Sequence, residues 1–342
     1  MRLSRQRLNR TLLRRQHLLE RTTASPVEMT AHLVGLQGQE PLPPYLSLAA
    51  RIDGFDPYAV SGGLEDRALV RLLTLRGTIH LLTADDALAL RPWTQPALDR
   101  VLRNHAAADP DVVRTRVHEA LADGPVGQRE LSDAVAPALP DVPRADVGVL
   151  ARGLVPLVQL PPRGTWKGPG GIVYDHLERW IGRPVVEPDV PALVRRYLRA
   201  FGPASAADVT AWSGVTRLVP VLTAMDDLVR HEDEAGKVIY DVADGVVEDE
   251  DVAAPVRLLG TYDNLWISHA GRDRVTAPEK RARWMGANGG VASMLFVDGW
   301  LEGLWRQVDG RVEVVELFRE LTPRERSGLD DEVGRVEALL AT

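Results

Sequence analysis

The sequence predicts an α+β fold of three tandem winged helix–turn–helix units, followed by a small antiparallel β-barrel-like domain and a C-terminal helix. One pattern, a helix, a Gly-Pro pair and a second helix, occurs twice, around Gly124-Pro125 and Gly202-Pro203. Further helical sequence and a hairpin follow each pair, which is the order of a winged helix. The last part of the chain is instead rich in strand patterns and Asp-Gly turns. A chain of 342 residues is long enough for several such units.

The first unit is predicted at residues 1–110. LNRTLLRRQHLLE begins it as an amphipathic helix with leucines on one side. Ser25-Pro26 then starts a second helix, VEMTAHLVGLQ, because proline is preorganised at a first helical position. YLSLAARID gives a third helix, and LVRLLTLRGTIHLLT has the apolar run and central glycine of a strand pair.

The second and third units are predicted at residues 111–189 and 190–254. In the second unit, LARGLVPLVQLPPRGTWKGPGGIVYDHL supplies a third helix and a wing rich in glycine and proline. In the third unit, Ser205 caps the helix that follows Gly202-Pro203. VRHEDEAGKVIYDV then forms a hairpin that turns at residues 234–236.

The C-terminal β domain is predicted at residues 255–342. Strand patterns occur in RLLGTYDNLWISH, ASMLFVDGWLEGLWRQ and RVEVVELFREL. Asp298-Gly299 and Asp309-Gly310 are typical two-residue hairpin turns. PRERSGLDDEVGRVEALLA then closes the chain as a helix.

Composition and charge restrict the class of protein. Cysteine is absent, no apolar run reaches the length of a membrane helix, and the N-terminus lacks the apolar core of a secretory signal. We therefore expect a cytoplasmic protein without a membrane partner. Net charge is −7, but residues 1–21 hold seven arginines and one acid, whereas residues 244–251 hold five acids and no base. This polarity predicts a basic first helix facing a polyanion and an acidic linker facing away from it.

No common catalytic or metal-binding constellation is present in the sequence. It contains no phosphate-binding P-loop, no Gly-x-Ser-x-Gly nucleophile elbow and no His-Glu-x-x-His pattern, and its eight histidines are scattered without ligand spacing. We therefore expect neither a metal nor another cofactor.

Three local features are candidates for a site. The first is Gln37-Gly38-Gln39, at the predicted end of the second helix, whose amides are either solvated helix-end groups or working groups of a site. The second is an alternation of Arg76, Thr78 and His80 with apolar residues. Strand periodicity places these three side chains on one face, which is either a polar wall of a cleft or simply half exposed.

The third feature is a cluster of polar residues within 261–279. Its candidate members are Asn264, Ser268, His269, Arg272 and Arg274. Such a density of polar groups at one strand end is explained equally well by a binding site and by a hydrogen-bond network that orders a loop.

Three stretches of the chain resemble the AlkZ-like DNA glycosylases, a winged-helix family that includes the YcaQ branch. The stretches are LVGLQGQEPLPPY, RGTIHLLTADDALALRP and YDNLWISHAGRDR. In this family the Gln-x-Gln step is the catalytic motif, and the resemblance maps it onto Gln37 and Gln39. The YcaQ branch has an acid at the second position of the motif. Because this chain has Gln39 there, it resembles the AlkZ branch. Between the two glutamines the family more usually has a small apolar residue, and Gly38 departs from this pattern.

The resemblance implies a substrate and a setting. The substrate is double-stranded DNA alkylated at guanine N7, including bulky natural-product adducts and interstrand crosslinks of the azinomycin kind. The setting is DNA repair in the nucleoid of an antibiotic-producing bacterium, where the activity contributes to self-resistance. The resemblance also implies that the three winged helices form a concave, positive surface around the duplex.

Two amides suffice for this chemistry only if the lesion is already cationic. N7-alkylguanine carries a positive charge, so its glycosidic bond is weak and needs no general acid. The enzyme then has only to orient a water molecule at C1′ and to tolerate the positive charge that develops on the sugar. Carboxamides both donate and accept hydrogen bonds without titrating. We therefore expect a monofunctional DNA glycosylase in which Gln37 positions the water and Gln39 supports the water or the DNA backbone.

Further residues are candidates for DNA contact. Arginines of the first helix and the wings are expected to bind phosphates, with Arg51, Arg71 and Arg76 nearest the motif. Trp300, in the hairpin LFVDGWLEGLW, either inserts beside the lesion or belongs to the core of the β domain. A crosslinked guanine cannot rotate fully out of the duplex, so we expect a shallow and open site.

Two other classes of protein stay open at this stage. One is a non-catalytic winged-helix DNA-binding protein such as a transcription regulator, and the other is a protein-interaction scaffold. Regulators usually need a dimerisation element. The sequence shows no heptad run, so we expect a monomer. Formation of abasic sites in DNA that contains N7-methylguanine distinguishes the three classes.

Overall fold

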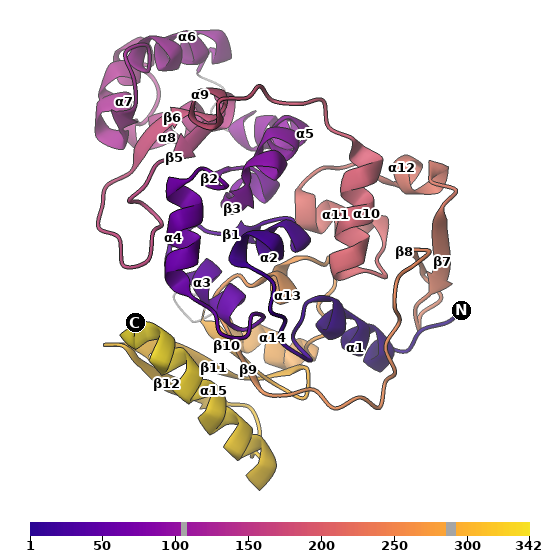
Figure 1. The fold of residues 1–342 in the computed structure, drawn as a ribbon. Coiled ribbons are helices and arrows are strands. Elements are labelled where there is room, and N and C mark those ends of the chain that lie inside the picture. Colours follow the sequence, from indigo (N-terminus) through magenta and orange to yellow (C-terminus); the bar gives the residue numbers. More distant parts are fainter. Residues whose placement is uncertain (104–107, 285–291) are drawn as a thin grey trace.

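The computed structural model describes residues 1–103, 108–284 and 292–342. It combines helices with antiparallel sheets, as predicted (Figure 1). The described strands form a six-stranded, a four-stranded and a two-stranded sheet. No helix in the described part of the chain has the length and apolar character needed to cross a membrane.

One order of elements occurs in three parts of the chain: helix, short strand, two helices and two strands. In the first repeat (residues 26–83) the elements are α2 (Pro26–His32), β1 (Leu36–Gln37), α3 (Leu42–Ala49), α4 (Pro57–Glu65), β2 (Leu69–Leu73) and β3 (Ile79–Thr83). In the second repeat (residues 110–176) they are α6 (Pro110–Ala120), β4 (Val126–Gly127), α7 (Gln128–Val135), α8 (Arg144–Leu154), β5 (Leu157–Gln159) and β6 (Val173–His176). In the third repeat (residues 190–242) they are α10 (Val190–Phe201), α11 (Ala206–Ser213), α12 (Val219–Ala224), β7 (Leu228–Glu232) and β8 (Val238–Val242), and a bridge between Ala204 and Tyr240 stands in for the short strand.

Local sequence explains where several helices of the repeats begin. Ser25 and Glu28 form a reciprocal capping box with Pro26 at the first helical position of α2. Ser205 caps α11 in the same way, as predicted. The sequence analysis missed α4, because Ser61, Gly62 and Gly63 lower its helix propensity. The helix forms nevertheless, since Asp56 caps it and its buried side chains pack on the core.

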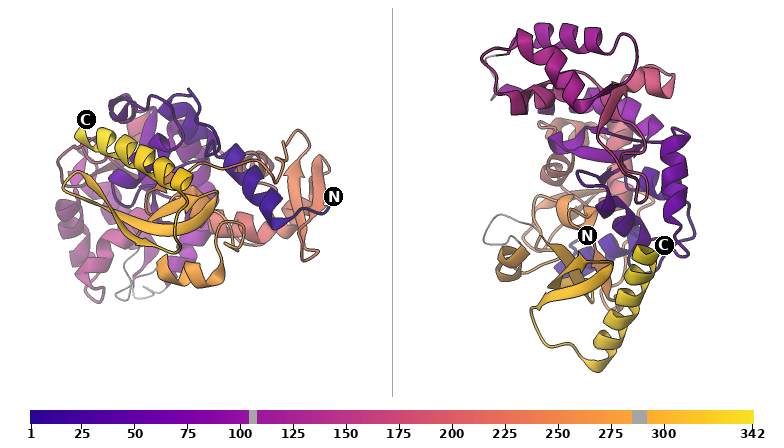
Figure 2. Two further views of the ribbon diagram at one scale, coloured as in Figure 1. Left: turned by 90° about the horizontal axis from the view of Figure 1, so that it is seen from below. Right: turned by 90° about the vertical axis from the view of Figure 1, so that its left-hand side faces the viewer.

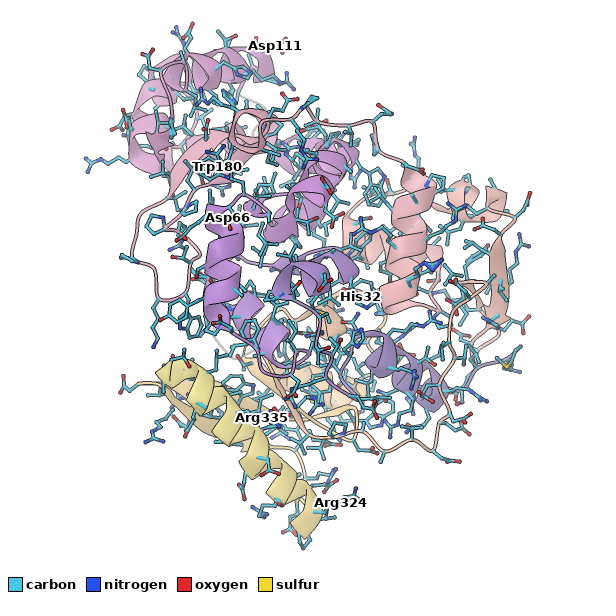
Figure 3. All side chains as sticks on the ribbon, viewed as in Figure 1. His32, Asp66, Asp111, Trp180, Arg324 and Arg335 are labelled. Carbon is cyan, nitrogen blue, oxygen red and sulfur yellow. The ribbon has the colours of Figure 1, made fainter. Side chains whose placement is uncertain are left out.

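The first two repeats share one sheet. Its strand order is β1-β3-β2-β5-β6-β4, so the two three-stranded halves meet where Leu72 of β2 lies opposite Val158 of β5. The Arg67 guanidinium lies 4.4 Å from the centroid of the Trp180 ring and so adds a contact between the first repeat and the helix that follows the second repeat. Figure 3 labels Trp180 and Asp66, the residue before Arg67. The long helix α5 (Ala84–Leu102) follows the first repeat, and α9 (Leu177–Ile181) follows the second.

The C-terminal sheet shares an apolar cluster with the first repeat, whereas the second repeat has a cluster of its own. The second repeat packs around its own apolar cluster, and it lies at the opposite end from the C-terminal sheet (Figure 2). Between them, apolar residues of the first repeat, the third repeat and the C-terminal part share one large cluster. The first repeat is therefore the centre of the molecule, and the candidate motif lies within it.

The C-terminal part forms an open sheet covered by a helix. The strands β9 (Arg257–Leu259), β10 (Ser293–Val297), β11 (Trp300–Val308) and β12 (Arg311–Leu317) follow the order β12-β11-β10-β9. Both predicted Asp-Gly turns are confirmed, with positive φ at each of their residues. The final helix α15 (Pro323–Ala341) is also confirmed. Because β12 and β9 do not pair, the described strands give no closed sheet, and the predicted barrel-like form is not confirmed.

A predicted strand between residues 257 and 269 was wrong beyond β9. The Asp263 carboxylate accepts a hydrogen bond from the Leu265 N–H and caps a short helix, α13 (Asn264–Ile267). A further helix, α14 (Pro278–Trp284), follows. The buried apolar residues of α13 resemble a strand in the sequence, but the aspartate cap selects the helix.

The first helix, which was predicted within the first unit, contacts the third repeat. α1 (Arg5–Arg15) packs on α10 of the third repeat. Leu3 and Leu8 form an apolar cluster with Ile239 of β8, and residue 2 bridges residue 232. On its other side, α1 contacts the turn between β10 and β11, where the Asn9 amide donates to the Gly299 carbonyl. It therefore lies outside the first repeat.

Candidate functional site

The Gln37-Gly38-Gln39 motif does not lie at a helix end, as had been predicted: Gln37 ends the short strand β1, and Gly38 and Gln39 follow it. Helix α2 stops at His32 because Val34 and Gly35 both have left-handed backbone, with φ of 51° and 96°. The Asn264 amide donates to the Gly35 carbonyl at 2.8 Å and supports this bend. The chain then enters β1, where Gln37 lies opposite His80 of β3, and the Gly38 N–H donates to the Ile79 carbonyl. The motif is thus fixed at a sheet edge.

The side chain of Gln37 is held by an arginine. Gln37 is only 9% exposed, and its Oε1 accepts a hydrogen bond from Arg76 Nη2 at 3.1 Å. A guanidinium can only donate, so the amide oxygen of Gln37 must face Arg76. Its Nε2 group has no protein partner in the described residues. The structure therefore orients this carboxamide with its amino group free.

Gln39 repeats this arrangement at the surface. Its side chain is exposed, and its Oε1 accepts a hydrogen bond from the Ile79 N–H at 3.2 Å. The Nε2 group of Gln39 likewise has no partner within the part of the chain that the structure describes. Two oriented carboxamides therefore accept hydrogen bonds from the same end of the β2–β3 hairpin, and each keeps a free amino group and one unused lone pair on its oxygen.

Arg76 was predicted on one strand face with Thr78 and His80, and this was wrong. Residues Leu75–Gly77 form a 3-10 turn between β2 and β3, and Arg76 has left-handed backbone with φ of 55°. The turn nevertheless brings the Arg76 and His80 side chains together. Thr78 is half-buried, and its hydroxyl donates to the Leu75 carbonyl within the same turn.

The position of Arg76 is determined from several sides. Its Nη1 donates to the Trp212 carbonyl at the end of α11. Gly214 packs so closely that a Cβ there would lie 3.2 Å from the Arg76 backbone. Burial, and then the nearby Arg272, lower the pKa of Arg76 to about 10. A left-handed non-glycine residue held in this way is typical of a functional position.

His80 is a neutral hydrogen-bond acceptor in this group. Arg76 Nη2 lies 3.1 Å from His80 Nε2, and His80 Nδ1 lies 3.0 Å from the Thr78 carbonyl. Because the arginine donates and the carbonyl accepts, the proton of the imidazole must be on Nδ1. Burial, and then the charge of Arg76, lower the pKa of His80 to about 3. His80 therefore supports Arg76 and is not placed to donate a proton.

Arg71 connects the motif to the second repeat. It is buried, its Nη2 donates to the Gly38 carbonyl at 2.7 Å, and burial lowers its pKa to about 10. On its other side it packs against Gly164, where a Cβ would lie 2.3 Å from Arg71 Cδ. Arg71 was predicted to bind phosphate, but its guanidinium is engaged inside the protein. This prediction is corrected to a support of the motif backbone.

A cluster of arginines without acidic partners lies beside the motif. The pKa of Arg272 is lowered by burial and then by Arg281, just as Arg272 lowers the pKa of Arg76. Arg272 is half-buried, with its guanidinium 5.6 Å from the centroid of the Trp266 ring. Among the described residues, no carboxylate forms an ion pair with any of these three arginines. Such uncompensated positive charge is suited to an anion such as a phosphate group.

Arg51 does not contact solvent, contrary to its predicted phosphate contact. It is 0% exposed, and its two terminal nitrogens donate to the Asp263 carboxylate, each at 2.8 Å. Arg51 Nη2 also donates to the Gln16 side chain. This ion pair joins α3 to the start of α13 and leaves no free donor for DNA at Nη1 or Nη2.

The polar cluster at residues 261–279 is largely a structural network. Asn264, Ser268, His269 and Arg274 are all buried. His269 Nε2 lies 3.0 Å from the Phe201 carbonyl, and Arg274 donates to the Pro203 carbonyl. These contacts order the loop against the third repeat and argue against direct DNA contact. Of the five candidates, only Arg272 is partly exposed near the motif.

Trp300 and the first helix lie away from the motif. The Arg5 guanidinium stacks over Trp300, at 5.7 Å from the ring centroid, and the turn that carries this tryptophan packs on α1. Insertion beside the lesion is therefore not supported.

Four of the five arginines of α1 form ion pairs within the protein, contrary to prediction. Arg7 pairs with Asp249 and Arg14 with Glu248, both at 2.7 Å, so the acidic segment 244–251 lies on the basic helix. Arg10 and Arg15 pair with aspartates elsewhere. The basic helix and the acidic segment of the sequence are thus in contact with each other inside the protein. Their opposite charges do not identify a surface that binds DNA.

The sequence analysis missed several residues around the motif. Tyr45 and Trp166 form an aromatic contact, with ring centroids 4.9 Å apart, beside the start of α3. The Tyr45 hydroxyl donates to the Gly164 carbonyl, next to the Arg71 contact. Tyr45 belongs to the family-like stretch LVGLQGQEPLPPY, but its partner lies more than a hundred residues away. A single sequence gives no indication of such a pairing.

Comparisons with known proteins agree on one group of relatives. A family model described as AlkZ-like DNA glycosylase matches residues 30–339. An interstrand DNA cross-link repair glycosylase from Streptomyces sahachiroi is 25% identical over 332 residues, which cover 88% of this chain and 87% of that protein. The solved structure of Streptomyces sahachiroi DNA glycosylase AlkZ superposes with a TM-score of 0.83 at 21% identity, covering 100% of this chain and 98% of that one. The fold is therefore shared along the whole chain.

Proposed function

Since this chain belongs to the family of AlkZ-like DNA glycosylases, we propose that it releases N7-alkylguanine from duplex DNA with Gln37 and Gln39 as its catalytic residues. The relative from Streptomyces sahachiroi is named for interstrand cross-link repair, which supports crosslinked guanines as further substrates. A non-catalytic DNA-binding protein is not favoured, because the family and this relative are glycosylases.

The observation that carries the proposal is the pair of oriented carboxamides. Both oxygens accept hydrogen bonds from the protein, so both amides are fixed before a substrate arrives. Fixed dipoles need no reorganisation during the reaction, which is the basis of electrostatic catalysis. Neither amide titrates, and a lesion that already carries a positive charge needs no general acid.

The proposed reaction is hydrolysis at C1′. The remaining lone pair of Gln37 Oε1 accepts a hydrogen bond from the attacking water, and Gln39 Nε2 donates to an oxygen of the DNA backbone. The oxygen of the water bonds to C1′ as the bond from C1′ to N9 breaks. The bonding electrons leave with the cationic base, which departs neutral, and a proton passes from the water to solvent. An abasic site results.

A monofunctional enzyme leaves the DNA strand intact at this abasic site. A lyase would instead form an imine between an amine of the protein and the sugar. The chain has three lysines, at positions 167, 237 and 280, and none enters the proposed step. Borohydride should therefore trap no covalent complex between the protein and DNA. A trapped complex would show lyase chemistry.

An open site is proposed for a crosslinked base. Ordinary glycosylases rotate the base out of the duplex, but a base tied to the opposite strand cannot leave fully. Gln39 lies exposed at the surface, which supports chemistry next to the duplex. Arg272 and Arg281 would then bind the phosphates that flank the lesion.

The three repeats are proposed to be winged-helix units that surround the DNA as a monomer. Their common order of three helices and a hairpin supports this division. The proposed boundaries remain 1–110, 111–189, 190–254 and 255–342, although α1 contacts the third unit. An enzyme acting on chromosomal DNA would work in the cytoplasm at the nucleoid, and removing bulky adducts would protect a producer of alkylating antibiotics.

Base release from a defined duplex tests the proposal. The purified protein should generate abasic sites in a duplex with one N7-methylguanine and none in the undamaged duplex. Gln37→Ala should lower the single-turnover rate at least a hundredfold. Gln6→Ala provides the matched control, since Gln6 lies on α1 and its side chain donates to the Glu250 carbonyl and to neither glutamine of the motif. A rate of Gln37→Ala near that of the wild type would remove Gln37 from the mechanism.

A further inference from the structure

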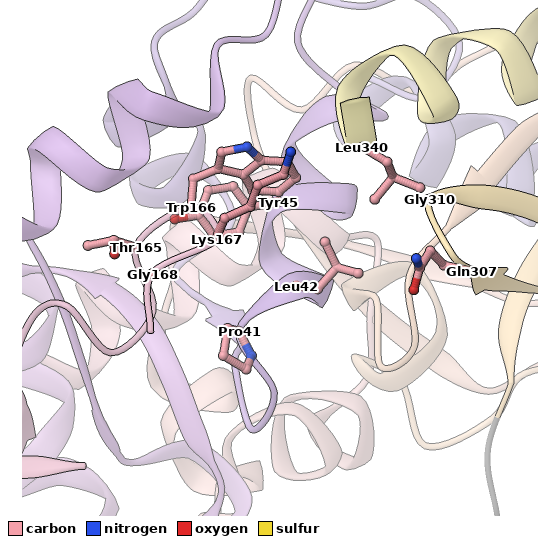
Figure 4. A pocket seen from close by; sticks show the side chains of 10 residues that line it. All are labelled: Pro41, Leu42, Tyr45, Thr165, Trp166, Lys167, Gly168, Gln307, Gly310 and Leu340. Atoms are coloured by element: carbon pink, nitrogen blue, oxygen red, sulfur yellow. The ribbon is translucent and has the colours of Figure 1, made fainter. Parts of the chain in front are cut away.

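We infer that an apolar cavity beside the catalytic motif accepts a neutral, flat apolar arm of the alkyl adduct, an inference that rests on the proposed function. The cavity has a volume of about 360 Å³ (Figure 4). Its lining residues, Pro41, Leu42, Tyr45, Thr165, Trp166, Lys167, Gly168, Gln307, Gly310 and Leu340, define what we call the arm cavity.

The arm cavity lies where three parts of the chain meet. Its walls are the start of α3, the turn 165–168 between β5 and β6, and the β11–β12 turn with the end of α15. Leu42 follows Gln39 by three residues, so their Cα atoms lie at most about 11 Å apart. An arm attached to a guanine held at the motif needs to cross only this distance.

The floor of the cavity is aromatic and fixed. The Tyr45 and Trp166 rings meet at an interplanar angle of 47°. The Tyr45 hydroxyl donates to the Gly164 carbonyl, and burial raises the pKa of Tyr45 to about 12, so this side chain stays neutral. The main-chain N–H of Trp166 donates to the Ser61 hydroxyl. A flat apolar group would meet ring edges that are already held in place.

The turn that carries Trp166 has a strained and crowded backbone. Lys167 has left-handed backbone with φ of 50°. The next residue must be glycine, because a Cβ at Gly168 would lie 2.0 Å from the Thr165 hydroxyl. Arg71 then connects this loop to the motif, since it packs on Gly164 and bonds to Gly38. The cavity and the catalytic amides therefore keep a fixed relative position.

Size and charge together select the occupant. A cavity of this volume is at the lower end of small-molecule sites, and a cavity of about 150 Å³ already holds benzene. Among the described residues that line it, Lys167 is the only charged side chain. A cationic alkylguanine would be repelled there, whereas a neutral aromatic or aliphatic arm would not. The cavity therefore suits the arm of the lesion and does not suit the damaged base.

Two duplexes that differ by one phenyl ring test this inference. One carries N7-methylguanine and the other N7-benzylguanine, each on a 2′-fluoro sugar that blocks base release, and the Kd of the full-length protein is measured for both. Wild type should bind the benzyl duplex about tenfold more tightly, as expected for partial burial of one ring. Leu340→Trp places an indole in the cavity and should reduce this preference to less than twofold. Ala341→Trp adds the same ring at the exposed neighbouring position and should keep it.

Other outcomes overturn the inference. They are a wild-type preference below twofold, or an equal loss of preference in both tryptophan variants. If thermal unfolding shows that Leu340→Trp is misfolded, Gln307→Trp fills the cavity from the β11–β12 side and gives the same comparison. The proposed function is tested separately with the unmodified sugar. Release of methylguanine without a benzyl preference refutes only the cavity, whereas a benzyl preference without base release refutes only the catalysis.

Discussion

The carboxamide of Gln37 depends on a neighbour for its orientation, and that neighbour was expected to bind DNA. Arg76 donates to Gln37 Oε1 and is itself held by His80 and by the Trp212 carbonyl. We therefore propose that Arg76 is a positioning residue, which acts on the proposed reaction through Gln37. This role can be separated from a phosphate contact by experiment.

Replacing Arg76 should slow base release while leaving DNA affinity nearly unchanged. A hydrogen bond from a charged donor contributes about 1.5–3 kcal/mol, so Arg76→Met should lower the single-turnover rate about tenfold to a hundredfold. The Kd for lesion DNA should change by less than about threefold. In the Gln37→Ala background, Arg76→Met should have no further effect, because the interaction is already lost.

The control is Arg100→Met, since Arg100 donates to the Gly214 carbonyl nearby without reaching either glutamine. This variant should keep the wild-type rate. If Arg76→Met instead slows the Gln37→Ala variant as much as it slows the wild type, Arg76 does not act through Gln37.

His80 should make the fold sensitive to mild acid. Its pKa is about 3 in the folded protein and 6.5 when unfolded, so the unfolded chain gains a proton first as pH falls. The stability that the neutral imidazole contributes is present above pH 6.5 and is lost between pH 6.5 and about 3. Between pH 7.5 and 5.0, wild type should lose up to about 2 kcal/mol more unfolding free energy than His80→Gln.

Urea unfolding of both proteins at the two pH values measures this difference. His17 and His269, whose pKa values are also lowered, occur in both proteins and cancel in the comparison. Equal losses in wild type and His80→Gln would mean that the pKa of His80 is the same in the folded and unfolded states, and would contradict this prediction.

At the scale of residues, the candidate motif could be proposed from the sequence, but the side chains that hold it could not. Gln37 and Gln39 were proposed from a family-like stretch of contiguous residues. The hydrogen bond from Arg76 to Gln37 was missed because the left-handed turn at Arg76 interrupts the alternation of side chains that a strand would have. Arg51 was mistaken for a DNA contact, since its partner Asp263 is distant in sequence and only the fold brings the two together.

At the scale of elements, the buried ion pair between Arg51 and Asp263 connects the end of α3 to the start of α13. Removing one partner of a buried ion pair leaves an uncompensated charge and costs about 3–5 kcal/mol. Asp263→Ala should therefore lower the unfolding free energy by about this amount, as measured by urea denaturation. Asp53→Ala is the matched control, because its contact with Arg335 is exposed and should contribute little.

A double replacement distinguishes the ion pair from the helix cap that Asp263 also provides. Arg51→Met combined with Asp263→Asn keeps a capping group and removes both charges. This variant should recover most of the stability lost in Asp263→Ala. If the double variant is as unstable as the single one, the buried charge of Arg51 is not the cause of the loss.

Elements were predictable where local patterns determine them. The Asp-Gly turns, the capped start of α2 and the final helix follow from residues adjacent in sequence. β1 was missed because a strand of two residues shows no periodicity, and its form depends on pairing with β3. α4 was missed because its glycines resemble a loop until tertiary packing is included.

At the scale of the whole molecule, charge was the property that the sequence predicted least well. The acidic segment 244–251 forms ion pairs with Arg7 and Arg14 of α1, so the arginines without acidic partners beside the motif become the candidates for DNA binding. Arg272→Ala should weaken binding to duplex DNA. It should also reduce the slope of log K against log salt concentration by about one.

Arg14→Ala should leave this slope unchanged, because Arg14 is already paired with Glu248. Fluorescence anisotropy at several salt concentrations gives both slopes. A smaller slope for Arg14→Ala than for Arg272→Ala would assign the phosphate contact to the first helix after all.

The arrangement of the repeats was only partly predictable. Part of their internal order follows from helix and turn patterns, but β1 and α4 were missed. The joining of β2 to β5 and the packing of α1 on the third repeat involve residues far apart in the chain. Pairing at a sheet edge is decided by the complementarity of whole surfaces, which a single sequence does not show.

Arg71 spans the boundary between two repeats, bonded to the motif at Gly38 and packed against Gly164. Any side chain introduced at position 164 would push on this guanidinium, and the displacement would arrive at the glutamines without a change in the motif itself. In a mutational scan, position 164 should behave like an active-site residue, although it lies 125 positions from Gln39 along the chain. A natural variant of this enzyme with a substitution at position 164 is therefore a poor reference protein for measuring the effects of other mutations.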